Sequence, residues 1–154
     1  GMHYLIPKFL EQGSGHIVNV GSFAAFSPMS GLGIYSATKH GLRAFTHSSD
    51  IELKDTPVGV SLVCPSAVET PMLDYLAKRD EGVIVFTQKP MPPRKMAEAI
   101  GRAVEEKKPE ILGPGVLGAV LRIIGLFPAL LKRSSAKAIE QGKVAAEKRR
   151  QEMS

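Results

Sequence analysis

The segment 31–45, GLGIYSATKHGLRAF, places a tyrosine four positions before a lysine, in what we expect to be the start of a helix. Residues four apart share a helix face, so the Tyr35 phenol and the Lys39 ammonium can lie close together. An ammonium near a phenol favours the phenolate, which lets a tyrosine give and take a proton near neutral pH. Most pairs at this spacing are only solvated neighbours, so other residues have to decide between the two interpretations.

Two hydroxyl residues favour the chemical interpretation. Ser22 follows the β-branched run 16–21, HIVNVG, which we expect to be a buried strand. A hydroxyl there lies at the carboxyl edge of a parallel sheet, where open α/β folds bind ligands, and can donate to a carbonyl oxygen while Tyr35 delivers the proton. Thr70 begins a short helix after the next strand, at a position suited to an amide or phosphate contact.

The elements that must position these residues alternate between strands and helices. This order predicts an α/β fold with a parallel sheet and helices on both of its faces. We expect strands at 16–21, 58–65 and 109–115, and helices at 2–11, 34–54, 70–79 and 92–107.

Composition excludes several other classes of protein. The single cysteine cannot form an internal disulfide, and the four histidines show no metal-ligand spacing, so we expect no metal site. No secretory signal is recognisable, and we expect a cytoplasmic protein. Most of the net charge of +5 comes from the tail 132–154, which has no aromatic or groove-reading partners for nucleic acid.

Three stretches, HIVNVGS, YSATK and CPSAVETPM, resemble in their order and spacing the motifs of the short-chain dehydrogenase/reductase (SDR) family. The resemblance covers about residues 2–113 and matches the C-terminal part of a Rossmann-like doubly wound parallel sheet. It implies an NAD(P)-dependent oxidoreductase that transfers hydride between a nicotinamide and a carbonyl or alcohol carbon.

The resemblance also implies a role for individual residues. Ser22 resembles the serine that orients the substrate, Tyr35 the proton donor, and Lys39 the lysine that activates the tyrosine and hydrogen-bonds the nicotinamide ribose. The residues implied to contact the nicotinamide end of NAD or NADP are Tyr35, Lys39, Pro65, Val68 and Thr70.

The sequence departs from the family in two ways. Ser66 stands where a glycine is usual, which stiffens the loop. More importantly, no glycine-rich turn lies between a strand and a helix, so the half that binds adenosine and pyrophosphate has no counterpart. We therefore expect a truncated form, with a partial SDR domain at 2–113, and the choice between NAD and NADP stays open.

Residues 114–154 form an apolar segment followed by a basic helical tail. The apolar run 111–131 suggests either a helix lying in an anionic membrane surface or one that packs on the cleft or on another subunit. Together with 71–91 it suggests a hydrophobic carbonyl or alcohol substrate.

We also expect a homo-oligomer, because small residues line one face of the helix at 34–54. The competing hypothesis is a non-catalytic SDR remnant that acts by dimerisation or by contact with a membrane surface. The small residues are Ala37, Gly41, Ala44 and Ser48.

Overall fold

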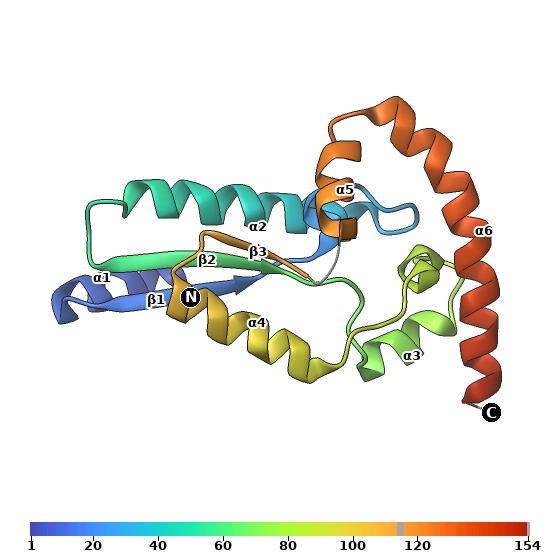
Figure 1. Ribbon diagram of the computed structural model, residues 1–154, viewed down its shortest axis with the longest axis horizontal. Helices are drawn as coiled ribbons and strands as arrows, with labels where there is room; N and C mark the ends of the chain where they lie inside the picture. Colours follow the sequence, from blue (N-terminus) through green and yellow to red (C-terminus); the bar gives the residue numbers. More distant parts are fainter. Residues whose placement is uncertain (114–115, 154) are drawn as a thin grey trace.

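A computed structural model describes residues 1–113 and 116–153, and its centre is a parallel sheet of three strands in the order β1-β2-β3 (Figure 1). The strands are β1 (Gly15–Val20), β2 (Val58–Cys64) and β3 (Glu110–Leu112). The second and third fall within the predicted runs, and the first begins one residue before its run, at Gly15. The third is shorter than expected, and 114–115 lie outside the described residues. The predicted α/β fold class is confirmed.

The central strand β2 is buried on both faces because helices cover both. Successive side chains of a strand point to opposite faces. Leu62 and Cys64 pack with Phe26 on the face covered by α2 (Gly33–Glu52). Val63 packs on the other face, against Ala99 and Ala103 of α4 (Pro93–Glu106). Figure 1 shows α2 and α4 on opposite sides of the sheet.

Local sequence signals set the ends of several helices. The first helix, α1 (Met2–Gln12), ends at Gly13, whose φ of 73° lies in the left-handed region that glycine tolerates best. Both α3 (Pro71–Ala77) and α4 begin with a proline, whose fixed φ suits the first helical position. These helices agree with the predicted ones to within a few residues.

A group of helices packs beyond the carboxyl ends of the strands. There α6 (Pro128–Glu152) lies beside α3 and the short 3₁₀ helix η2 (Val83–Thr87), as Figure 1 shows. The approach is close at Gly142, where a Cβ atom would lie 2.3 Å from the Val83 carbonyl oxygen. The buried apolar side chains of this group are Leu73, Ala77, Val83, Phe86 and Ala146.

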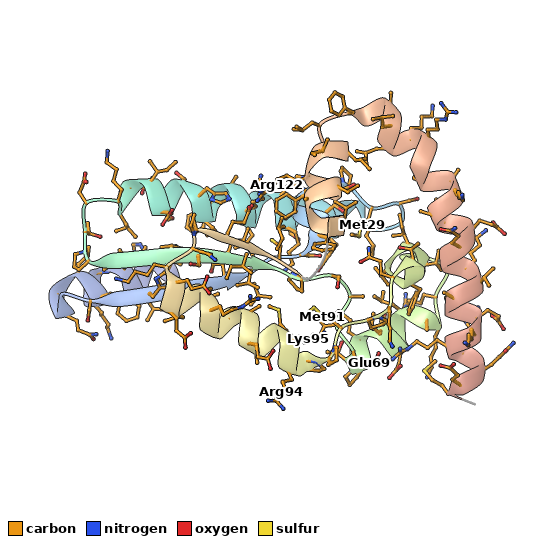
Figure 2. All side chains as sticks on the ribbon, viewed as in Figure 1. Met29, Glu69, Met91, Arg94, Lys95 and Arg122 are labelled. Carbon is orange, nitrogen blue, oxygen red and sulfur yellow. The ribbon has the colours of Figure 1, made fainter. Side chains whose placement is uncertain are left out.

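Ion pairs also hold the basic end of α6 on the fold. The Arg149 guanidinium donates to Asp74 at 2.8 and 2.9 Å and also binds Glu69, which is labelled in Figure 2. The hydrogen bond from Arg149 lowers the pKa of the Glu69 carboxyl. The tail is therefore a packed helix. The division into domains 2–113 and 114–154 stays a prediction.

The apolar segment 111–131 is not one helix. It contains the end of β3, the helix α5 (Val116–Ile124), a turn at 125–127 and the start of α6. Arg122 of α5, labelled in Figure 2, forms an ion pair with Glu110, which fixes α5 to the sheet. Within the described ranges, no helix has both the length and the apolar character needed to cross a bilayer.

Candidate functional site

A cavity of about 360 Å³ lies where the carboxyl ends of β1 and β2 face α3 and η2. Its position is the one expected for a ligand site in an open α/β sheet. The structure brings all the sequence-predicted site residues to the wall of this one cavity. They are Ser22, Tyr35, Lys39, Pro65, Val68 and Thr70.

The first turns of α2 carry the tyrosine and the lysine on the same face. The Lys39 Nζ atom lies 5.7 Å from the centre of the Tyr35 ring and donates a hydrogen bond to the Val20 carbonyl at 2.9 Å. That bond ties the ammonium to the end of β1, beside the cavity. Tyr35 is 39% exposed, so its phenol remains accessible to a ligand.

Ser22 is held by the turn that follows β1. Its Oγ accepts a hydrogen bond from the Ala24 amide at 3.2 Å, which caps the short 3₁₀ helix η1 (Phe23–Ala25). The hydroxyl proton of Ser22 is not used in that bond and can be donated to a ligand.

The loops after β1 and β2 are joined by backbone hydrogen bonds. The Gly21 amide donates to Val63 at 2.8 Å, and the Phe23 amide donates to Pro65 at 3.0 Å. Because the pairing of β1 and β2 continues beyond the strands, Ser22 and Pro65 have fixed relative positions.

The loop that carries Val68 and Thr70 is held against residue 91. Val68 forms an isolated parallel bridge with Met91, and the Met91 amide donates to Ala67 at 2.8 Å. Thr70 is the N-cap residue of α3, but its Oγ1 donates to the Val68 carbonyl at 3.2 Å and makes no capping bond. Its lone pairs are therefore open to a ligand.

The cavity is mostly apolar and carries a single positive charge. Among the described residues that line it, Lys39 is the only charged one. The buried Cys64 lies behind the wall, and burial raises the pKa of its thiol to about 11, so it stays neutral and is no nucleophile. The arrangement suits a neutral, electron-rich oxygen beside the Tyr35 phenol and the Lys39 ammonium.

Sequence reasoning predicted the segment 71–91 but not the individual apolar side chains that it contributes to the wall. The expectation that 71–91 contributes is consistent with the cavity, whereas none of the described residues of 116–131 lines it. Spacing could have found Leu32, which lies one helical turn before Tyr35. Met72 and Leu76 lie four positions apart on α3, whereas the other side chains come from segments without a regular period. The wall includes Met29 (labelled in Figure 2), Leu32, Met72, Leu76, Ile84, Val85 and Gln88.

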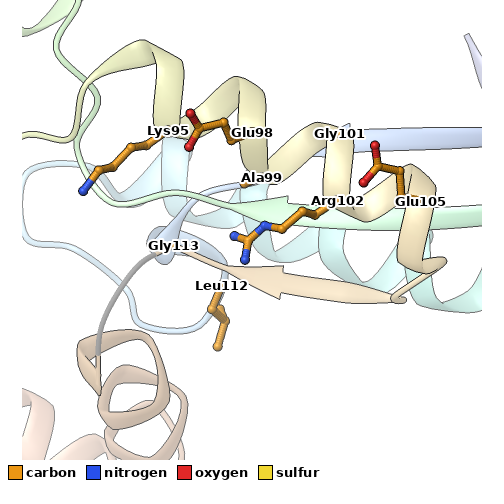
Figure 3. A pocket seen from close by; sticks show the side chains of 8 residues that line it. All are labelled: Lys95, Glu98, Ala99, Gly101, Arg102, Glu105, Leu112 and Gly113. Atoms are coloured by element: carbon orange, nitrogen blue, oxygen red, sulfur yellow. The ribbon is translucent and has the colours of Figure 1, made fainter.

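A second and more open pocket of about 590 Å³ lies between α4 and β3 (Figure 3). Its wall on α4 carries two basic residues, Lys95 and Arg102, and two acidic ones, Glu98 and Glu105. Charges of both signs along one helix face are typical of a solvated surface. None of the sequence-predicted residues lies in this pocket, and we assign it no chemistry.

Comparison with known proteins gives one family. The sequence model described as short chain dehydrogenase matches residues 1–81. An uncharacterized oxidoreductase of Staphylococcus epidermidis is 34% identical over 101 residues, which are 66% of this chain and 41% of the relative.

Solved structures give the same fold. A short-chain dehydrogenase/reductase from Burkholderia phymatum in complex with NAD is 28% identical, with a TM-score of 0.67 over 79% of this chain and 51% of that one. Actinorhodin polyketide ketoreductase with NADPH is 26% identical, with a TM-score of 0.63 over 71% of this chain and 49% of that one.

The chain thus spans about two fifths of the curated relative and about half of the solved structures that it matches. The family match covers more than half of the chain, and the three-stranded sheet corresponds to part of the family's Rossmann-like fold. This chain belongs to the short-chain dehydrogenase family.

Proposed function

We propose that the chain carries the proton-transfer and nicotinamide-binding part of an NAD(P)-dependent oxidoreductase that acts on a hydrophobic carbonyl or alcohol. One observation carries this proposal: the serine, the tyrosine, the lysine and the loop residues 65–68 and 70 all line one cavity. Residues so far apart in sequence gather there only because β1 and β2 are neighbours.

The donors around the cavity fit the nicotinamide end of the cofactor. Lys39 has three N–H groups and uses one of them for Val20, which leaves donors for ribose hydroxyls. Pro65 and Val68 offer an apolar wall for a flat ring, and Thr70 offers a hydroxyl. The adenosine end has no such set of donors among the described residues, because the outer edge of β1 pairs with no strand there.

The proposed reaction divides the work among three side chains. When bound, the cofactor supplies hydride to the carbonyl carbon or accepts it from the alcohol carbon. In the reducing direction, Ser22 donates a hydrogen bond to the carbonyl oxygen and orients it. Tyr35 gives its phenolic proton to that oxygen, so the C=O bond becomes C–OH, and the Lys39 ammonium stabilises the phenolate that is left.

The wall opposite these residues indicates the substrate class. It consists mainly of methionine, leucine, isoleucine and valine side chains from α3, η2 and the loop before α2. Such a wall favours an apolar body, and the volume of about 360 Å³ suits a small or medium-sized molecule. The ketoreductase among the structural relatives supports a carbonyl substrate.

Separate NMR titrations with the nicotinamide half and the adenosine half of the cofactor test the proposal. Reduced nicotinamide mononucleotide should shift the NMR signals of residues 65–70 and of the amides near Lys39, with weak, millimolar affinity. Adenosine monophosphate should shift neither set. Lys39→Met should weaken the first response about tenfold, because the ribose loses charge-assisted hydrogen bonds.

The matched control is Lys54→Met, which removes an ammonium that is 71% exposed just after the far end of α2. It should leave the nicotinamide response unchanged. Equal shifts with both half-cofactors, or equal losses in both lysine variants, would show that the cavity does not select a nicotinamide and would remove the proposal.

A second candidate function is dimerisation without catalysis. The small residues Ala37, Gly41, Ala44 and Ser48 of α2 are exposed, and Phe45 beside them is 55% exposed. A Cβ atom at Gly41 would contact nothing, so this face leaves room for the backbone of another helix. Ala44→Arg should lower the oligomeric mass if α2 forms this contact.

A further inference from the structure

The turn between α5 and α6 presents apolar side chains that the chain's own fold leaves uncovered. We call these the corner patch. Ile123 is 60% exposed, Leu126 74%, Phe127 52% and Leu130 52%. Figure 1 shows this turn at a corner of the molecule, away from the sheet. Four large exposed apolar side chains, two in the turn and one at the adjoining end of each helix, mark an interaction surface.

The fold fixes the direction in which the corner patch points. On the inner side of α5, Arg122 is paired with Glu110 and lies over the Phe26 ring at 5.4 Å. Gly125 packs so closely that a Cβ atom would lie 2.0 Å from the Phe26 carbonyl oxygen. Because the inner side is anchored in this way, the patch has no room to fold back onto the sheet.

The charge around the corner patch is positive. No acidic residue lies between Glu110 and Glu140 in the sequence. Just after the patch come Lys132, Arg133 and Lys137, all exposed. A surface that combines an apolar turn with neighbouring ammonium and guanidinium groups complements acyl chains beneath anionic headgroups.

We propose that the corner patch inserts into the surface of an anionic lipid bilayer, with Lys132 and Arg133 on the headgroups. A second copy of the chain fits less well. A two-fold dimer at this corner would bring the same patch of both copies together. Two sets of basic residues would then lie close, and the segment 111–139 has no acidic residue to pair with them. The contact is confined to the corner, since the end of α6 is held on the fold by Arg149 and its carboxylates.

Vesicle flotation tests the proposal with the full chain. Vesicles of phosphatidylcholine mixed with phosphatidylglycerol should bind the protein, and vesicles of phosphatidylcholine alone should bind it much less. Binding should fall as salt is raised, because screening weakens the attraction to the headgroups. Leu126→Ser/Phe127→Ser should weaken binding at least about tenfold, and Lys132→Glu/Arg133→Glu should have a similar effect.

Two control variants separate the corner from the rest of α6. Val144→Ser removes an apolar side chain that is 68% exposed on the same helix. Lys143→Glu/Lys148→Glu reverses two other exposed charges of that helix. Both should bind vesicles as the unchanged chain does, and circular dichroism should show the same unfolding temperature for all variants, since the changes lie on the surface.

Three results would overturn the proposal. The first is absence of binding to the anionic vesicles. The second is an equal loss in the control variants, which would mean a non-specific attraction of the basic helix. The third is a lower oligomeric mass in the Leu126→Ser/Phe127→Ser variant without lipid, which would assign the patch to self-association. None of these measurements involves cofactor, so they are independent of the proposed oxidoreductase.

Discussion

The Lys39 ammonium lies between the strand end and the Tyr35 ring, and this position determines what each group can do. Its bond to the Val20 carbonyl fixes the nitrogen at the cavity wall. Replacing the lysine therefore removes both a charge and an anchor of α2. The tyrosine offers a cleaner test, because only its hydroxyl group is needed for the proposed proton transfer.

Tyr35→Phe removes that hydroxyl and keeps the ring. We expect reduction of a hydrophobic ketone to fall by about a hundredfold or more, because positioned general acids contribute at least that much. Binding of reduced nicotinamide mononucleotide should change little. The rate is measured as alcohol formed at saturating reduced nicotinamide, and the binding by NMR.

Tyr4→Phe is the control for this prediction, since Tyr4 is 74% exposed on α1, away from the cavity wall. It should leave the rate unchanged. A Tyr35→Phe protein that reduces ketones at the original rate would exclude Tyr35 as the proton donor.

Among the elements, α6 depends on one close contact with η2. Gly142→Ala would place a methyl group within 2.3 Å of the Val83 carbonyl oxygen. We expect it to lower the free energy of unfolding by about 1–3 kcal/mol, because α6 has to move away from η2. Urea denaturation followed by circular dichroism measures the change.

Gly101→Ala is the matched change, in the middle of α4, where a Cβ atom would contact nothing. There the same substitution should stabilise the protein by about 0.5–1 kcal/mol, since alanine favours the helix. If both variants were stabilised, α6 would not lie against η2 as described.

The contact between α2 and β3 depends on pH through His47. Burial, and next the Arg43 charge, lower the pKa of His47 below its ordinary value of about 6.5. The neutral ring donates from Nε2 to the Glu110 carboxylate at 2.9 Å. A depressed pKa gives stability that is present above pH of about 6.5 and is lost as the pH falls through the folded value.

His47→Gln keeps a donor and removes this titration. The free energy of unfolding should therefore decrease less steeply in the variant than in the unchanged protein as the pH falls below about 6.5. Some slope will remain, because burial also lowers the pKa of His16. Urea denaturation at several pH values measures both slopes, and parallel curves would contradict the prediction.

For the whole molecule, the open edge of β1 determines how the chain behaves alone. β1 pairs with β2 on one side, and its outer backbone groups have no strand partner among the described residues. Such an edge can pair with another chain. We expect a polypeptide of these 154 residues to self-associate and to bind NAD(H) poorly.

Sedimentation velocity at several concentrations measures this association. Ala44→Arg should remove contacts through α2 and lower the mass without giving a pure monomer, because the edge of β1 is left unchanged. A monodisperse monomer with micromolar NADH affinity would contradict the expectation.

Much of this architecture could be predicted because its signals are local. β-branched runs mark the strands, prolines at 71 and 93 mark two helix starts, and three motifs in order mark the predicted site. The packing of α6 on η2 was missed. The positions that face η2 and α3, the partly buried Ile139 and the buried Gly142 and Ala146, have helical spacing, but two of them are too small to give an apolar signal. The break at 125–127 was missed too, although Pro128 at a helix start could have located it.

The two walls of the cavity come from different elements of the fold, and this bears on how the sequence can vary in evolution. The side chains proposed to handle the proton come from the rigidly paired strand ends and from α2, whereas the opposite wall comes from α3 and η2, which rest on α6. Substitutions in the second wall can widen or narrow the space without disturbing the first. Under the proposed function, related sequences can therefore differ in substrate preference while they keep the residues proposed to handle the proton.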